Sequence, residues 1–261
     1  MRLGVLLRNM GPQSAPDLLR ACALRAETAG LDDLWVVADK PSGIQTHRGF
    51  GERAPALLQR LRDALQGPVY PVHRLDRAAS GIIIMARTSE AARHLSEQFR
   101  ASIPRKRYLA WVRSRPPEYG ILDHPVPRSK DGPRVPARSS FCRLVHHDRA
   151  SVVEVCPWTG RYHQIRRHLK HLSAPILGDV TYGDGRANRR AREEFGLFRL
   201  ALHAFELAFR HPSTGAQISV TCPLPEDLAS SLARWRDDVA AFLPDAARPR
   251  RAPQSAGSSG P

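Results

Sequence analysis

The sequence predicts an α+β fold that is rich in strands. Apolar runs of strand length recur along the chain, and fewer segments carry apolar residues at helical spacing. Turns rich in glycine and proline separate these segments. The 261 residues, 42% of them hydrophobic, are enough for one large domain or two small ones with a substantial core.

The first 37 residues read as strand, helix, strand. Arg2–Leu7 is a short apolar run, and a turn rich in glycine and proline follows it. Residues 17–29 carry apolar side chains on one helical face, and Gly30 is a stop signal. Leu34–Val37 is the second strand of this segment. We treat residues 1–37 as an atypical N-terminal extension of the domain that begins at residue 38.

The next segment alternates helices and strands. Residues 40–43 form a turn, and residues 56–64 are predicted to be helical. Residues 81–87 are continuously apolar up to their last position, which is typical of a buried strand. A helix is expected over 89–101, with Thr88 or Ser89 as its cap, and a strand over 108–112.

The second half of the chain is predicted to contain two strand pairs, two helices and two polar segments. The predicted strands are 139–145 with 151–156, and 202–209 with 217–222 around a Pro-Ser-Thr-Gly turn. The predicted helices are 160–172, which has a strongly basic face, and 226–242. The remaining two segments are an exposed loop over 127–138 and a disordered tail over 245–261. The main domain therefore extends over 38–244.

The charge balance indicates a polyanionic partner. Lys and Arg number 40 against 25 acidic residues, giving a formal net charge of +15, and arginine supplies most of the positive charge. The guanidinium fork matches two phosphate oxygens, so RNA or DNA is the expected partner. The alternative is that a GC-rich genome produces an arginine-rich composition. No apolar run approaches the length of a membrane span and no signal peptide is apparent, so we expect a cytoplasmic protein. The sequence does not indicate an oligomeric state, and a monomer is the default expectation.

The first stretch that could carry chemistry is His-Arg-Leu-Asp-Arg-Ala-Ala-Ser-Gly, residues 73–81, just before the buried strand. Asp76 lies between Arg74 and Arg77, and nearby positive charge favours the ionised carboxylate. An ionised carboxylate suits a nucleophile or a general base. The alternative is a loop aspartate in a structural ion pair, and this alternative is favoured when the tripeptide Arg-Leu-Asp is considered alone.

Two further stretches are strongly basic. In Arg105-Lys106-Arg107-Tyr108 the tyrosine could stack on a base whose phosphates the cations hold, or it could be a core residue beside a basic edge. Residues 159–169, Thr-Gly-Arg-Tyr-His-Gln-Ile-Arg-Arg-His-Leu, place several arginines at a helix start, as an anion-contact surface or as partners for a buried acid. The histidines of this stretch lack an acid or cysteine that would complete a metal site, so we predict no metal.

Together the three stretches resemble the RluA-type RNA pseudouridine synthases, whose motifs HRLDxxTSG, KxY and GRxHQIRxH occur in this order. The resemblance covers residues 34–224, and it includes Asp39-Lys40-Pro41-Ser42-Gly43 and Leu202-His203-Ala204. It implies a mixed, mostly antiparallel central sheet with flanking helices and loops around a catalytic cleft. The stretch from Gly178-Asp179 to Leu197 is most similar to the TruC-like branch, which implies tRNA as the substrate, with rRNA as the alternative.

The resemblance also implies residue roles. Asp76 would be the catalytic aspartate, Tyr108 would stack on the flipped uracil, and Arg166 would pair with Asp76. Arg74 would enter the RNA stack. The other residues expected to contact RNA are His73, Arg77, Arg105, Lys106, Arg107, Arg161, His163 and Arg167. The reaction isomerises uridine in place, so no cofactor is expected, in agreement with the absence of a P-loop or dinucleotide fingerprint.

Two departures from the family pattern stand out. Ala79 replaces the usual threonine, which removes a loop hydroxyl but no catalytic group. Residues 1–37 do not match the family and instead resemble the start of a luciferase-like flavin monooxygenase, although they are far too short for that barrel. A flavin-dependent oxidoreductase is therefore one alternative function. The other is a non-catalytic RNA-binding protein of the same fold, which the joint presence of Asp76, Tyr108 and Arg166 disfavours.

Overall fold

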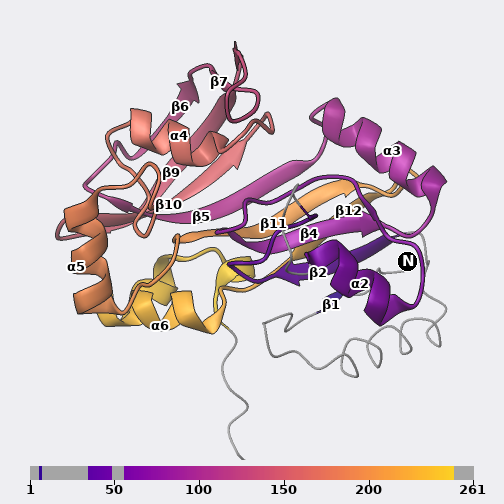
Figure 1. The fold of residues 1–261 in the computed structure, drawn as a ribbon. Coiled ribbons are helices and arrows are strands. Elements are labelled where there is room, and N and C mark those ends of the chain that lie inside the picture. Colours follow the sequence, from indigo (N-terminus) through magenta and orange to yellow (C-terminus); the bar gives the residue numbers. More distant parts are fainter. Residues whose placement is uncertain (1–5, 8–34, 49–55, 250–261) are drawn as a thin grey trace, which may run out of the picture.

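The computed structural model describes residues 6–7, 35–48 and 56–249. These residues form one large sheet of ten strands in the order β1-β2-β4-β11-β5-β10-β9-β6, with β12 beside β11 and β3 beside β4 (Figure 1). Two pairs in the sheet, β1 with β2 and β11 with β4, are parallel, and the others are antiparallel. The prediction of an α+β fold with a mixed, mostly antiparallel sheet is confirmed.

The elements have the following bounds. The strands of the large sheet are β1 Leu6–Leu7, β2 Trp35–Lys40, β3 Tyr70–Pro71, β4 Ser80–Ala86, β5 Arg105–Arg113, β6 Tyr119–Asp123, β9 Arg138–His147, β10 Ala150–Pro157, β11 Leu202–Arg210 and β12 Gln217–Thr221; the separate pair is β7 Val126–Pro127 and β8 Arg134–Val135. The α-helices are α2 Leu57–Leu65, α3 Ser89–Arg100, α4 Gln164–His171, α5 Gly185–Phe195 and α6 Glu226–Trp235, and the 3₁₀ turns are η1 Val239–Phe242 and η2 Asp245–Ala247.

Strand β4 lies at the centre of one half of the molecule, buried on both faces. Its side chains alternate between two core clusters, because successive residues of a strand point to opposite faces. Ile83 and Met85 join the cluster that includes Leu57 and Leu61 of α2. Ile82 and Ile84 join the cluster that includes Ala91 and Leu95 of α3. Helices α2 and α3 therefore cover opposite faces of the sheet, which explains why the 81–87 run is continuously apolar.

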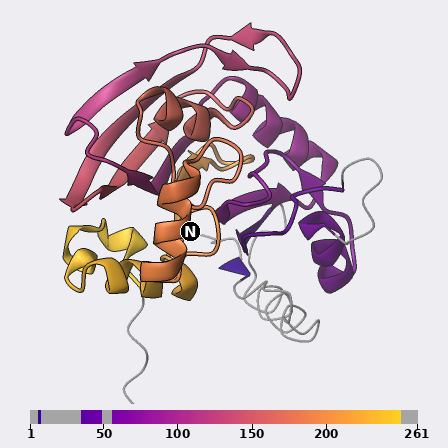
Figure 2. The ribbon, with the colours of Figure 1, turned by 60° about the vertical axis from the view of Figure 1, so that its left-hand side comes forward.

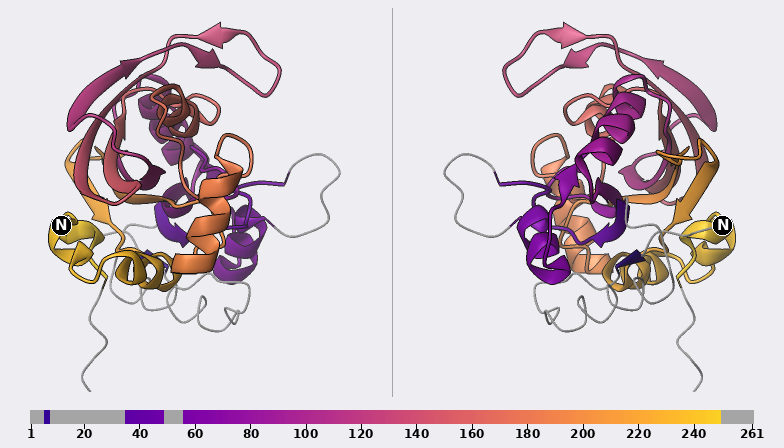
Figure 3. Two further views of the ribbon diagram at one scale, coloured as in Figure 1. Left: turned by 90° about the vertical axis from the view of Figure 1, so that its left-hand side faces the viewer. Right: turned by 90° about the vertical axis from the view of Figure 1, so that its right-hand side faces the viewer.

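The other half of the sheet curves around α4. Figures 2 and 3 show β9, β10 and β6 arching over this helix, with the β7–β8 hairpin extending from the arch. Helices α5 and α6 lie at the edge of the molecule below this arch in Figure 1. This curvature leaves α4 facing the strand ends of β4 and β5, where the sequence places its basic and acidic stretches.

Most predicted elements are confirmed, and the differences have local causes. The predicted helix 160–172 begins only at Gln164, because His163 has a left-handed conformation (φ 52°) that ends the preceding turn. The predicted helix 226–242 is α6 followed by the 3₁₀ turn η1. The predicted loop 127–138 contains the last residue of β7, the turn of the β7–β8 hairpin, the whole of β8 and the first residue of β9.

Helix α5 was not predicted from the sequence. Its segment is dominated by arginine, and Ala191 is its only fully buried residue, so its apolar periodicity is weak. The signals that were present are terminal ones. Asp184 caps the helix by accepting a hydrogen bond from the N–H of Ala187, and Gly196 ends it in a left-handed conformation.

The predicted boundaries fall within ordered structure. Strand β2 crosses residue 37 and pairs along its whole length with β4, so the boundary between residues 37 and 38 cuts a strand of the main sheet. Residues 1–5 and 8–34 lie outside the described part of the chain. The predicted tail begins at residue 245, yet Ala247 is fully buried and its carbonyl accepts a hydrogen bond from Leu224 N–H. The disorder predicted for 250–261 also lies outside the described residues.

None of the helices in the described part of the chain is both long enough and apolar enough to span a membrane.

Candidate active site

The three basic stretches meet at one cleft of about 670 Å³. Its walls come from the loop before β4, the C-terminal half of α3, the start of β5, the β7–β8 loop and the residues leading into α4. Asp76, Tyr108 and Arg166 all line it, although they are separated by up to 90 residues in the sequence. The sheet thus brings the candidate catalytic side chains together.

The loop that carries Asp76 is clamped to the turn after β2. Lys40 is fully buried, and its ammonium donates hydrogen bonds to the carbonyls of Pro41 (2.8 Å), Ile44 (2.9 Å) and Arg77 (3.2 Å). The Ser42 hydroxyl donates to the carbonyl of Ala78 at 2.7 Å. These bonds fix the backbone on the C-terminal side of Asp76, so the carboxylate is presented from a rigid loop.

Close packing at Gly81 holds the same loop against the rest of the sheet. Gly81 has φ 113°, and a Cβ at this position would lie 2.2 Å from the carbonyl oxygen of Ala204 in β11. Only glycine fits there. The neighbouring Ser80 hydroxyl lies 3.0 Å from Nδ1 of His203, whose Nε2 faces the Cys222 carbonyl at 3.2 Å. Burial lowers the pKa of His203 to about 4, so the ring is a neutral structural link at pH 7.

A buried ion pair holds Arg166. The side chain of Asp179 is completely buried, and its two oxygens accept hydrogen bonds from Nε and a terminal nitrogen of Arg166 at 2.7 and 2.8 Å. The other terminal nitrogen of Arg166 donates to Asp76 at 3.4 Å. Because a bidentate pair fixes the guanidinium plane, Asp179 decides where Arg166 points, and Arg166 in turn faces Asp76.

The backbone around Asp179 shows why the sequence has glycine before it. Gly178 has φ 77°, and a Cβ there would lie 1.9 Å from the carbonyl oxygen of Arg199. The carboxylate of Asp179 also accepts hydrogen bonds from the N–H groups of Thr181 and Tyr182. Burial alone would raise the pKa of Asp179, but its bonds from Arg166 and these N–H groups lower it, so the carboxylate stays ionised. No role for Asp179 was predicted from the sequence, because a Gly-Asp pair is also an ordinary turn signal.

Tyr108 and Lys106 lie on the cleft face of β5. Tyr108 is buried, and burial, together with the nearby charge of Asp76, raises the pKa of its phenol, which therefore stays neutral. Burial lowers the pKa of Lys106 to about 8, with Arg161 adding to the shift. The ammonium of Lys106 donates to the carbonyl of Thr159 at 3.3 Å. The cleft thus holds an apolar ring and a readily deprotonated amine side by side.

His163 links the cleft to the loop that follows Asp179. Its Nδ1 lies 3.0 Å from the hydroxyl of Tyr182, its Nε2 lies 3.9 Å from a carboxylate oxygen of Asp76, and its ring stacks on Tyr162. Burial lowers the pKa of His163 despite the nearby Asp76, so the ring is neutral at pH 7. His163 can therefore hold the two aromatic side chains in place without competing with Arg166 for the carboxylate.

Several residues expected to contact RNA lie elsewhere. Arg105 and Arg107 point to the face of β5 opposite Tyr108, where Arg107 pairs with Glu154 and Glu206 and Arg105 pairs with Glu206. The structure therefore does not bring these two arginines to the cleft. The alternation of a strand separates them from Lys106, which the sequence analysis had grouped with them.

Of three other residues predicted to contact RNA, His73 lines the cleft, and Arg77 and Arg167 lie outside its lining. His73 lines the cleft, but its Nε2 accepts the N–H of Ile84, its ring stacks on Phe99, and burial lowers its pKa to about 3, so it carries no charge. Arg77 donates to the Gly43 carbonyl outside the cleft lining. Arg167 is outside the lining too, with its guanidinium 4.8 Å from the ring centroid of Tyr182.

Exposed cations surround the mouth of the cleft. Arg74 and Arg161, both predicted to contact RNA, line it and are exposed. Arg128 and Lys130, on the β7–β8 loop, line it as well, although the sequence analysis described this segment only as an exposed loop. An opening with this many cations favours a polyanion that threads past Asp76.

The sequence and the fold match known enzymes. The family model for RNA pseudouridylate synthase matches residues 34–171. The chain is 38% identical to tRNA pseudouridine synthase C of Haemophilus ducreyi, covering 75% of this chain and 89% of that protein. It is 37% identical to tRNA pseudouridine synthase C of Salmonella typhimurium, covering 82% and 90%. Among solved structures, human RNA pseudouridylate synthase domain containing 4 has a TM-score of 0.66 at 28% identity, covering 85% of this chain and 98% of that one.

The chain therefore belongs to the RNA pseudouridylate synthase family, in its RluA-type group. The activity of that class is the isomerisation of uridine to pseudouridine in RNA, so this protein is an isomerase that acts on an RNA substrate. The family and fold implied by the sequence motifs are confirmed.

Proposed function

We propose that the protein isomerises a specific uridine of tRNA, with Asp76 as the catalytic carboxylate. The observation that carries the chemistry is the contact of Asp76 with Arg166 at 3.4 Å in a cleft that also holds the Tyr108 ring. The support for tRNA is that the relatives at 37–38% identity are named tRNA pseudouridine synthase C and are covered over about nine tenths of their length.

The target uridine must leave the RNA stack to reach Asp76. Unstacking a base costs a few kcal/mol. Arg74 is exposed at the mouth of the cleft, and in the proposal it fills the gap left in the RNA. Tyr108 offers its ring to the extruded uracil, which offsets part of the unstacking energy.

The isomerisation then proceeds without any added group. The N1–C1′ bond breaks, the uracil rotates, and a C5–C1′ bond forms; the proton leaves C5 and N1 gains one. The Asp76 carboxylate acts either by adding to the ring or ribose or as a base. Arg166, held by Asp179, pairs with the carboxylate and orients it in the cleft.

Tyr108 gives a graded test of stacking. We expect Tyr108→Phe to retain more activity than Tyr108→Ala, because phenylalanine keeps the ring that stacks on uracil, and such stacking is worth about 1–3 kcal/mol per base. The measurement is single-turnover tritium release from RNA labelled at C5 of uridine. If Tyr108→Phe is as inactive as Tyr108→Ala, the hydroxyl takes part in proton transfer and stacking is not its main role.

Lys106 predicts a pH dependence of RNA binding. Because its pKa is lowered to about 8, the side chain is a cation at pH 7 and becomes neutral as the pH rises through 8. A neutral amine no longer attracts phosphate, so we expect the affinity for RNA to fall between pH 7 and pH 9. The Lys106→Arg variant stays charged across this range. If wild-type protein and Lys106→Arg show the same pH profile, Lys106 does not contact the phosphates.

The substrate class can be tested directly. Total tRNA and total rRNA, each transcribed with 5-tritiated uridine and lacking modifications, are incubated separately with the protein. We expect tritium release from tRNA and none from rRNA. The position of the pseudouridine is then mapped in RNA from cells with and without the gene. Release from rRNA alone would contradict the tRNA proposal while leaving the isomerase activity intact.

Two further parts of the proposed function rest on the sequence alone. The protein acts as a monomer, and it acts in the cytoplasm. Light scattering of the purified protein tests the first part, and cell fractionation tests the second.

A further inference from the structure

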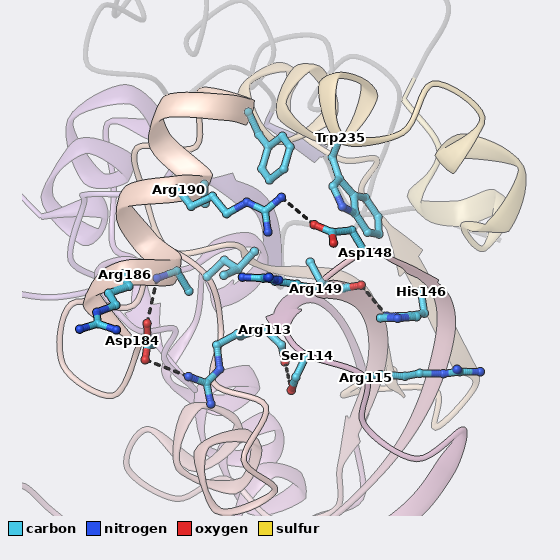
Figure 4. Close-up of a pocket in the computed structure, with 15 residues that line it drawn as sticks. Arg113, Ser114, Arg115, His146, Asp148, Arg149, Asp184, Arg186, Arg190 and Trp235 are labelled. Atoms are coloured by element: carbon cyan, nitrogen blue, oxygen red, sulfur yellow. Dashed lines mark hydrogen bonds and ion pairs between the residues drawn. The ribbon is translucent and has the colours of Figure 1, made fainter.

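A second pocket, of about 610 Å³, lies at the far end of β5 from the cleft (Figure 4). Its lining comes from the end of β5, the turn between β9 and β10, helix α5 and Trp235 of α6. Five arginines line it against two aspartates, which leaves three positive charges uncompensated within the pocket. The arginines are Arg113, Arg115, Arg149, Arg186 and Arg190, and the acids are Asp148 and Asp184.

The two aspartates are already used by two of the arginines. Asp184 accepts a hydrogen bond from Arg113 at 2.8 Å, and Asp148 pairs with Arg190 at 2.6 Å. The remaining three, Arg115, Arg149 and Arg186, are exposed and make no side-chain ion pair within the described residues. The pocket therefore combines two arginines that are held in place with three whose donors are available to a ligand.

Arg149 lines this pocket from a tight turn and is exposed. It occupies the two-residue turn between β9 and β10, next to Asp148, whose φ of 50° is the left-handed conformation that such tight turns require. In the view of Figure 4 its guanidinium lies between those of Arg113 and Arg190. The turn is anchored because the carbonyl of Arg149 accepts a hydrogen bond from Ser114 N–H at 2.7 Å. The backbone is thus fixed while the side chain is free to bind.

The pocket floor is apolar and rigid. Ala191 and Trp235 are buried beneath the arginines, and Trp111 packs against both Trp235 and Phe195 at about 5 Å between ring centroids. A floor of this kind lowers the local dielectric, which strengthens the attraction of the arginines for an anion. The fork of donors on arginine matches the paired oxygens of a phosphate group.

The pocket is within reach of an RNA bound in the cleft. Tyr108 faces the cleft and Arg113 faces this pocket, and they are five residues apart on β5, or about 17 Å at the rise of a strand. The loop over residues 179–184 also connects the two sites. At one end Asp179 binds Arg166 of the cleft, and at the other end Asp184 binds Arg113 of the pocket. A folded RNA is larger than this separation, so one molecule can occupy both.

We propose that this arginine pocket binds backbone phosphate of the RNA substrate outside the target site. Arg149, Arg115 and Arg186 supply the free donors, and Arg113 and Arg190 complete the positive field. The pocket then extends recognition from the target uridine to a second part of the same folded RNA. This inference rests on the proposed function only for the identity of the RNA.

The test compares two triple variants of the full-length chain. One is Arg115→Gln, Arg149→Gln, Arg186→Gln. The matched control removes the same charge from exposed arginines that line neither site, Arg93→Gln, Arg210→Gln, Arg248→Gln. The probes are an unmodified tRNA transcript that the protein modifies and the isolated stem-loop of that transcript that carries the target uridine. Dissociation constants are measured over a series of KCl concentrations.

We expect the pocket variant to bind the full transcript about tenfold more weakly than the control does, with a shallower dependence on salt, since each lost phosphate contact takes roughly 0.7–0.9 from the slope. The loss for the stem-loop is expected to be smaller. Tritium release at saturating transcript should match the wild type. If both triple variants bind the transcript equally, with equal salt slopes, the pocket does not contact RNA.

Two cases need a separate measurement: an unstable triple variant, and a wild-type protein that modifies no tRNA. Arg149→Gln alone, in an exposed turn, applies the same test if the triple variant is unstable in thermal melting, with a correspondingly smaller shift. If the wild-type protein releases no tritium from any tRNA, the proposed function fails. The pocket is still tested in that case by the affinity of the two triple variants for an unmodified tRNA transcript that the wild-type protein binds.

Discussion

Asp76→Asn is expected to abolish tritium release from 5-tritiated uridine RNA, with a rate reduced by roughly 10⁴-fold or more, as for other residues that act directly in covalent chemistry. Asparagine keeps the size of the side chain but can neither add to the substrate as a nucleophile nor accept a proton as a carboxylate does. The contact with Arg166 is long, at 3.4 Å, and Asp76 is partly exposed, so its charge is not needed to hold the fold.

The binding of RNA should survive this substitution. The exposed cations at the cleft, such as Arg74 and Arg161, are unchanged, and removal of a negative charge from the cleft favours a polyanion slightly. Asp63→Asn, at an exposed position of α2, is the matched control and should be fully active. Turnover by Asp76→Asn at the rate of this control would show that Asp76 is a structural loop residue.

Asp179→Asn is expected to have the second largest effect, on both stability and activity. The substitution leaves the buried Arg166 with only its longer contact to Asp76, and breaking a buried pair in this way costs about 3–5 kcal/mol. Asparagine also replaces one acceptor oxygen by an N–H₂ group, which cannot accept the hydrogen bonds that Arg166 and the N–H groups of Thr181 and Tyr182 donate to Asp179. Urea denaturation measures the loss of stability. Single-turnover tritium release measures the loss of rate, which we expect because Arg166 is no longer aimed at Asp76.

Asp184→Asn is the matched control on the same loop. Asp184 also pairs with an arginine, Arg113, but this pair is partly exposed and contributes about 1 kcal/mol or less. If Asp179→Asn is no less stable than Asp184→Asn, the Arg166–Asp179 pair does not hold the site. Arg166→Leu separates the two effects, since it removes the guanidinium from Asp76 and should be nearly inactive even in protein that remains folded.

The Asp179 pair also predicts the response to acid. Because the folded protein lowers the pKa of Asp179, the stabilisation is complete above the unfolded pKa of about 3.9 and is lost as the pH falls through the folded value. Wild-type protein should therefore lose stability below about pH 4 more steeply than Asp179→Asn. Equal acid profiles for the two proteins would contradict the assignment of this carboxylate as the partner of Arg166.

The sequence predicted the elements that have strong local signals. Strand β4 is an unbroken apolar run because both of its faces are covered, and α3 has the Thr88 cap and the Ala91, Leu95 spacing that the structure confirms. Helix α5 was missed because its signals are at its two ends and its own face buries little. A local pattern of apolar residues therefore predicts a helix or strand only when that element buries enough apolar side chains of its own.

The sequence alone determined the family, which the family match over residues 34–171 confirms, and it supplied Asp76, Tyr108 and Arg166 as candidates for the chemistry. The tertiary structure decided which charges can act together. It turned Arg105 and Arg107 away from Tyr108, buried Asp179 against Arg166, and gathered five arginines from distant segments into a second pocket. The physical reason is that long-range packing decides which face of a strand lines the cleft and which residue pairs with a given charge. Neither can be read from one short stretch of the sequence.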